Sequence, residues 1–164
     1  QPVAGLHLGL GVRTGHLGQN SQSAPAAHTA SRYDAAIAWV ADDWNLGLEY
    51  FYAENFMNVT TSYGNSADGY SLFGSYSITP RIALFARYDH VRPCHDTTPA
   101  CASDLVNTYY NLGVQFNASS EVKFALVYKY SRVAHGFFDT ANGLIGGVNS
   151  GTYQEIGVFM QMDF

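Results

Sequence analysis

Several charged side chains of this sequence are placed so that they could pair with one another on one face of a sheet. Glu49, Arg87, Lys129 and Glu155 stand near the middle of stretches in which apolar and polar residues alternate, and Arg13 has the same setting in the first such stretch. Because successive side chains of a strand point to opposite faces, these charges lie opposite the apolar residues. An unpaired charge away from water is very costly. We therefore expect these five residues to form a charge network.

Two roles fit such a network. It could form a charged constriction that selects ions in a wide pore, or a polar core that holds a narrow barrel shut. The interior of a closed eight-stranded barrel is just wide enough to be filled by side chains, so the second role is favoured for eight strands alone. The first role is favoured if the chain is half of a larger barrel or pairs with another copy.

Catalysis would require a nucleophile beside a histidine and an acid. Ser131, His135 and Asp139 are the nearest such set, and Asp89 with His90 is a second partial one. Residues four apart in a strand share a face but lie about 13 Å apart along it, which is too far for direct proton transfer. We expect no catalytic residues and no cofactor.

Two cysteines, Cys94 and Cys101, bracket a short polar loop that reads CHDTTPAC. This close spacing favours a disulfide, which requires an oxidising compartment such as the periplasm. Two free thiols, or a weak metal pair with His95, are the alternatives. His90, His95 and Asp96 could suggest a metal site, but a metal normally needs three or four converging ligands, so we expect none.

The elements that must position these residues are strands, because the apolar residues recur with a period of two. This alternation occupies residues 6–12, 33–41, 46–52, 70–78, 82–88, 110–116, 122–130 and 153–164. Short turns are expected at 42–43, 79–80 and 117–121, and long polar loops at 15–30, 55–68, around the cysteines and at 135–151. Short and long connections that alternate strictly predict an up-and-down sheet with the short turns and both chain ends at one side.

The composition favours a membrane barrel. Charged residues make up 13% of the chain, against a usual figure of about 25%, yet the mean hydropathy is only −0.08. No run approaches the roughly 18 apolar residues of a membrane helix, whereas each strand of a barrel averages an apolar and a polar face. We expect residues 1–164 to form one all-β domain, a transmembrane antiparallel up-and-down β-barrel with eight strands in this chain.

The alternative all-β fold is a soluble eight-stranded sandwich, which also alternates. A sandwich would place polar residues on its outer surface, whereas here one face of nearly every strand is apolar. Tyr and Trp near the strand ends also suit the two interfacial girdles of a barrel. The net charge of −5 argues against nucleic acid as a partner, because phosphate binding needs clustered cations.

The last predicted strand runs from Tyr153 to Phe164 and ends on an aromatic residue. Bacterial outer-membrane β-barrels resemble it closely, since their last strand commonly ends in Phe, which the assembly machinery reads. The resemblance implies that Phe164 is a C-terminal assembly signal and that the barrel-assembly machinery is a partner.

A more specific resemblance extends from about Arg32 to the end of the chain. The segments that carry it are RYDAAIAWVADDW (32–44), LGLEYFYAENF (46–56), GYSLFGSYSITPRIALFARYDHVRP (69–93), TYYNLGVQF (108–116), ALVYKY (125–130) and GTYQEIGVFMQMDF (151–164). In order and spacing they resemble the C-terminal half of bacterial outer-membrane porins of the phosphate-selective porin O and P type. The resemblance implies an outer-membrane location and a passive pore.

The sequence therefore predicts a porin-like protein of the bacterial outer membrane that passes small solutes or ions. Its expected partners are outer-membrane lipid, the assembly machinery and, as one option, further copies of the chain. A closed structural or adhesive barrel with a filled lumen is the alternative, and a lipid-modifying enzyme is a remote one. Whether strand 6–12 pairs with strand 153–164 decides between a narrow barrel and part of a wider pore.

Overall fold

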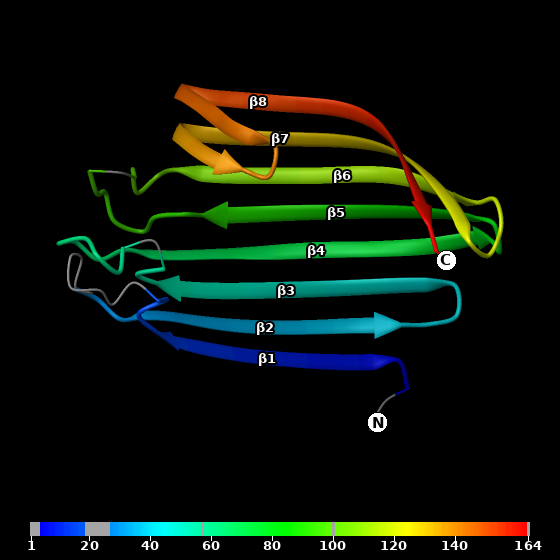
Figure 1. The fold of residues 1–164 in the computed structure, drawn as a ribbon, viewed down its shortest axis with the longest axis horizontal. Helices are drawn as coiled ribbons and strands as arrows, with labels where there is room; N and C mark the ends of the chain where they lie inside the picture. Colours follow the sequence, from blue (N-terminus) through cyan, green and yellow to red (C-terminus); the bar gives the residue numbers. More distant parts are fainter. Residues whose placement is uncertain (1–3, 19–26, 57, 100, 164) are drawn as a thin grey trace.

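The computed structural model describes residues 4–18, 27–56, 58–99 and 101–163. They form one sheet of eight antiparallel strands, in which each strand pairs with the next one in sequence (Figure 1). The strands are β1 (Leu6–Gly15), β2 (Ala30–Val40), β3 (Trp44–Glu54), β4 (Ser66–Thr79), β5 (Ile82–Arg92), β6 (Val106–Asn117), β7 (Val122–Thr140) and β8 (Gly143–Met162). Nowhere in these ranges is there a helix long and apolar enough to cross a membrane.

The up-and-down order confirms the topology predicted from the alternating connections. The short β2–β3, β4–β5 and β6–β7 turns lie at one end of the sheet, where β1 begins and β8 ends (Figure 1). Proline 80 sits in the β4–β5 turn, outside the hydrogen-bonded ladder, where its missing N–H does no harm. The all-β, antiparallel part of the prediction is therefore confirmed.

The sheet is open at both edges. Within the part of the chain that the structure describes, β1 pairs only with β2 and β8 only with β7. A barrel that closes on itself between β1 and β8 is not formed by this chain. The narrow, plugged barrel that such a closure would give is therefore absent from this fold.

The two faces of the sheet differ sharply in chemistry. Residues that lie opposite each other on neighbouring strands point to the same face of the sheet. Gly47 and Phe73 are such a pair on one face, and Leu48 and Leu72 are such a pair on the other. One face, called here the apolar face, carries Leu, Ile, Val, Met, Tyr and Trp. The other, called here the polar face, carries the charged, amide and hydroxyl side chains together with Gly and several Phe. The period of two in the sequence thus places apolar and polar side chains on opposite faces of the sheet.

The predicted loop at 135–151 is wrong, because this segment is a β-hairpin that continues β7 and β8. A bulge between Ala134 and Gly136 shifts the register, and His135 takes a positive φ of 62°. The bulge breaks the period of two, which is why the alternation in the sequence fails there. The hairpin turn is held by Thr140, whose hydroxyl donates to the carbonyl of Gly143 at 2.8 Å.

The hairpin folds back over the sheet (Figure 1) and is anchored by a small buried cluster. Leu105, Val133 and Ile145 form its centre, and Phe138 and Cys101 pack against it. Leu105 lies directly before β6, so the cluster joins the hairpin to the cysteine loop as well as to β7. This is where the described chain buries a compact group of apolar side chains.

The cysteine loop is closed by the predicted disulfide between Cys94 and Cys101. Beside it Asp68 accepts hydrogen bonds from Arg92 Nε and Nη2 at 2.9 and 3.0 Å, and lies 2.8 Å from His95 Nε2. This cluster sits beyond Tyr70, at the end of the sheet that carries the long connections. It fixes the loop to the ends of β4 and β5.

Candidate functional site: the polar face

Two parallel rows of side chains cross the polar face from strand to strand. The first row follows the register Phe73, Arg87, Asn111, Lys129 and Glu155 from β4 to β8. The second row follows Glu49, Ser71, Asp89, Tyr109, Ser131 and Tyr153 from β3 to β8. Direct neighbours in a row have Cβ atoms about 4.5–5.5 Å apart. The rows therefore form one polar band near the middle of the sheet.

The cations of this band each meet a carboxylate. Arg87 Nε donates to both carboxylate oxygens of Asp89 at 2.8 and 2.9 Å. Lys129 Nζ lies 3.3 Å from Glu155 Oε1 and 4.6 Å from the centroid of the Phe159 ring. The structure thus brings three of the predicted network residues, Arg87, Lys129 and Glu155, into one row and gives two of them direct ionic contact.

The other two predicted network residues are placed differently. Glu49 lies in the second row, opposite Ser71 and two strands from Asp89. Arg13 is on β1 opposite Arg32, far across the sheet from Lys129. Arg32 in turn binds Asp34 at 2.8 Å, with its guanidinium 4.8 Å from the Phe51 ring centroid. Arg13 therefore belongs to a separate charged group near the β1 edge.

A hollow of about 680 Å³ lies over the end of the polar face nearest the long connections. Its floor includes Ser71, Arg87 and Asn111, and the tip of the β7–β8 hairpin, with Phe138 and Asn142, forms another part of its wall. The size lies within the roughly 300–1,000 Å³ of small-molecule sites. This hollow is called here the hairpin hollow.

A second hollow of about 520 Å³ lies on the same face toward the short turns. It is lined by Ala38, Asn45 and the rings of Phe73 and Phe85. Arg87 and Asn111 line both hollows. Arg87 and Asn111 therefore mark the junction of these two hollows on the polar face.

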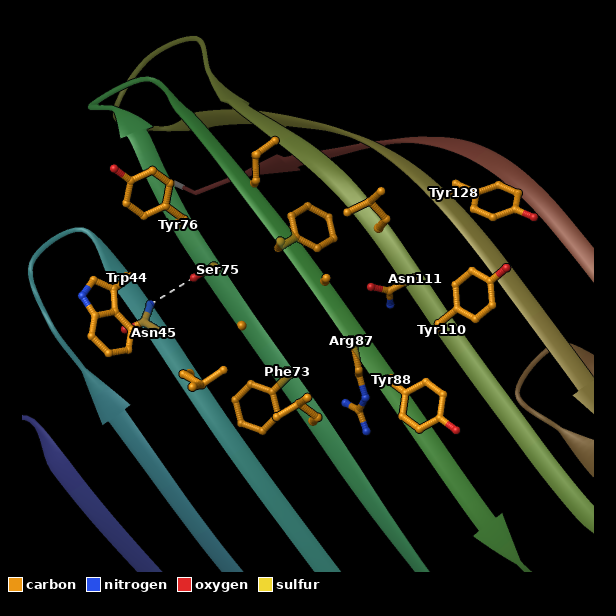
Figure 2. Close-up of a pocket in the computed structure, with 17 residues that line it drawn as sticks. Trp44, Asn45, Phe73, Ser75, Tyr76, Arg87, Tyr88, Tyr110, Asn111 and Tyr128 are labelled. Carbon is orange, nitrogen blue, oxygen red and sulfur yellow. Dashed lines mark hydrogen bonds between the residues drawn. The ribbon is translucent and has the colours of Figure 1, made fainter.

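The apolar face has a shallow hollow of its own, of about 770 Å³. Gly74 and Ala86 face each other there across β4 and β5 and are the small residues at its floor. Figure 2 shows aromatic side chains around it, with Trp44 and Tyr76 toward the short turns and Tyr88, Tyr110 and Tyr128 on the opposite side. The same view shows Asn45 donating to the Ser75 hydroxyl at 3.2 Å (Figure 2).

The partial catalytic sets of the sequence are not assembled as nucleophile and base. Ser131 is 1% exposed, and its hydroxyl donates to Asn107 Oδ1 at 3.3 Å. His135 Nδ1 lies 3.5 Å from Asp104 Oδ2 instead. His90 stacks on Tyr70 on the apolar face. Each of these groups thus has a partner other than the one catalysis would require.

For the metal question, no three His, Cys, Asp or Glu side chains within the described ranges converge on a common point. His95 binds Asp68 rather than a sulfur, and both cysteines are in the disulfide. The predicted assembly signal, Phe164, lies outside the described residues.

The Asp68 carboxylate, at the end of the sheet that carries the long connections, has the clearest electrostatic setting beyond the polar band. Its side chain is 12% exposed. Burial raises the pKa of Asp68, but the hydrogen bonds and charges of Arg92 and His95 outweigh this and leave the pKa below its ordinary value. Asp68 is therefore held ionised as the acceptor that fastens the cysteine loop.

Several residues of the band were missed in the sequence. Ser71, Tyr109 and Asn111 do not carry a charge at neutral pH, so residue type alone does not mark them as members of a charge network. The signal that could have found them is the alternation itself, because all three stand at polar-face positions of their strands, where Ser71 lies opposite Asp89 and Tyr109 and Asn111 lie opposite Asp89 and Arg87. The hairpin tip was missed because its segment was expected to be a loop.

No family model, curated protein or solved structure matches this chain. The two faces of the sheet and the side chains they carry are the features that bear on function.

Proposed function

We propose that this chain forms part of the wall of a passive, porin-like pore in a bacterial outer membrane. The apolar face contacts lipid, the polar face contacts water, and small solutes or ions pass along the polar face. The pore works without a cofactor and without catalysis. The resemblance to phosphate-selective porins agrees with this proposal, which extends to the assembly machinery as a partner.

The observation that carries the proposal is the exposure of the apolar face. Leu10, Ile156 and Val158 are 89%, 75% and 74% exposed, and no other element of the described chain covers them. Soluble monomers rarely expose contiguous apolar patches larger than a few hundred Å². An apolar face that continues over all eight strands requires lipid around it.

Aromatic residues at both ends of the apolar face support a membrane setting. Near the short turns Trp39 and Trp44 lie with ring centroids 5.0 Å apart, and near the long connections Tyr110 stacks on Tyr130 at 4.8 Å. Along β3 the span from Trp44 to Tyr52 is about 27 Å at the rise of an antiparallel strand. Tilted by about 40°, such a span covers about 21 Å of the membrane normal, slightly less than the roughly 25 Å apolar band of outer-membrane barrels.

The open edges favour a wide pore over a sealed barrel. Because the strands alternate in direction and there are eight of them, β1 and β8 run in opposite directions. Further strands of a longer chain, or a second copy of this one, could therefore join both edges by antiparallel pairing. Closure is needed because unpaired backbone groups are costly in lipid. A closed structural or adhesive barrel would need β1 to pair with β8, which this sheet does not do.

Planar-bilayer conductance tests the proposal. Protein folded in detergent, with its strand content checked by circular dichroism and its number of copies by light scattering, is expected to give discrete current steps. Asn111→Trp, at the junction of the two hollows, should lower the step size, whereas Leu112→Trp, next to it on the apolar face, should leave it unchanged. Folded protein that gives no steps, or equal effects of the two variants, would contradict the proposal.

A further inference from the structure

We infer that the hairpin hollow is a binding subsite for an uncharged, polyhydroxylated solute of the sugar class. This inference deepens the proposed pore function and depends on it for its physiological meaning. It arises from three properties of the hollow: unsatisfied polar atoms, charges that are already paired, and aromatic surfaces beside amides.

Two residues that line the hollow each have a buried polar atom without a hydrogen-bond partner. These atoms are the Ser71 hydroxyl oxygen and Asn111 Oδ1, and the Ser71 residue is 7% exposed. Buried polar atoms are almost always hydrogen-bonded, and leaving one unsatisfied is costly. The hollow is large enough for a small molecule. A bound solute would supply the hydrogen-bond partner that these two side chains lack.

A hydrogen bond between Asn111 and Tyr109 makes these two side chains complementary to a diol. Asn111 Nδ2 donates to the Tyr109 hydroxyl oxygen at 3.0 Å, which leaves the Tyr109 O–H free to donate. Asn111 Oδ1 remains free to accept. Adjacent hydroxyls of a sugar can each donate and accept, so they match a donor and an acceptor held side by side.

The charges of the hollow argue against an anion as the solute. Each of its three cations already binds a carboxylate: Arg87 binds Asp89, Lys129 binds Glu155 and Arg32 binds Asp34. A phosphate would have to break one of these pairs, and no uncommitted Lys or Arg lines the hollow within the described ranges. An uncharged solute requires no such exchange.

The walls offer rings and neutral hydrogen-bonding groups. Tyr109 comes from β6 and Phe138 from the hairpin, while Asn107 and Asn142 add amides. Aromatic rings beside a few placed polar groups are typical of small-molecule sites, and the C–H faces of a sugar pack against such rings. The hairpin thus supplies one side of the subsite and the strands the other.

The test is a titration of the folded protein in lauryldimethylamine oxide micelles, whose head group is not a sugar. Maltotriose is the neutral probe and inorganic phosphate the anionic one, followed by saturation-transfer NMR and calorimetry. We expect saturable maltotriose binding, no saturable phosphate binding, and about a tenfold weaker affinity for Asn111→Leu. Ser71→Ala should also weaken binding, whereas Ser75→Ala, which is outside the hollow, should not.

Each other outcome is decisive. Folded protein without saturable maltotriose binding, phosphate binding tighter than maltotriose, or an Asn111→Leu affinity equal to wild type would overturn the inference. Conductance without maltotriose binding would overturn this inference alone. Binding that depends on Asn111, in protein without conductance, would uphold the subsite and overturn the pore.

Discussion

The ring of Phe85 covers the backbone of Gly113, its direct partner on the next strand. The far edge of the ring occupies the space in which a Cβ of Gly113 would stand. Phe73 covers Gly47 in the same way. Glycine weakens a strand interior, and an aromatic ring from the neighbouring strand compensates for the missing side chain. Phe73 and Phe85 thus cover the strand backbone at the two glycines.

The Phe85 and Gly113 contact predicts a cost for a small substitution. Gly113→Ala should lower the free energy of unfolding by about 1–3 kcal/mol, because the methyl group displaces the ring. Gly9→Ala, on the same face, should cost far less, since its Cβ would meet Ala36 at an ordinary 3.7 Å. Urea unfolding in lipid vesicles measures both. Equal effects would show that the ring does not cover Gly113.

The assignment of the two faces predicts opposite responses from neighbouring residues. Leu126 is 54% exposed on the apolar face, and Ala125 next to it lies on the polar face, opposite Gln115. Leu126→Arg should cost about 2–4 kcal/mol in a bilayer, whereas Ala125→Arg should cost much less. Folding yield into vesicles and urea midpoints give the comparison. If Ala125→Arg proved the more damaging, the faces would be reversed.

The Cys94 and Cys101 disulfide predicts a dependence on redox state. It closes a loop with a sequence separation of 7, for which the chain-entropy estimate is about 2–3 kcal/mol. The Cys94→Ser/Cys101→Ser variant should lose stability of this order in urea unfolding. Added reductant should destabilise the wild type toward the variant and leave the variant itself unchanged. A variant as stable as oxidised wild type would exclude a structural role for the bond.

The lowered pKa of Asp68 predicts that its contribution is lost in acid. A carboxyl whose pKa is lower in the folded state stabilises the fold above its unfolded pKa of about 4. This stabilisation disappears as the pH falls through the lowered value. Asp68→Asn should therefore destabilise the protein at pH 7, and the difference from wild type should shrink at a pH well below 4. Asp42→Asn, in the β2–β3 turn, is the control. A difference that is equal at both pH values would contradict the ionic role of Asp68.

Much of the fold could be predicted because strand formation leaves a local mark in the sequence. The alternation in residues 82–88 corresponds to β5, and the Asp42 and Asp43 turn falls between β2 and β3. The segment around His135 could not be predicted in this way. It has a positive φ and a register shift, and the hairpin beside it packs through Val133 and Ile145 into the buried cluster, a long-range contact that no local pattern encodes.

The sequence predicts which face of the sheet a site residue occupies, but it does not predict which residues of the other strands lie beside it. Alternation alone places Arg87 and Lys129 on the same face, yet which residues become neighbours depends on the number of residues in each turn. Asn111 stands between them because of the registers of β5, β6 and β7. The same dependence separates Arg13 from the band. Register is a property of pairs of strands, and it is not contained in either strand alone.

The strict succession of strand pairs also bears on how the sheet is built. Every ladder joins neighbours in the sequence, so each new strand can add to the one placed just before it, across one connection only. Loop-closure entropy grows with the length of chain that is closed, and sheets made of local pairings form faster than those made of distant ones. Growth can thus proceed as a zipper. If the chain forms the proposed pore, the slow steps are the additions at the outer edges of β1 and β8, because these ladders are not local in the sequence.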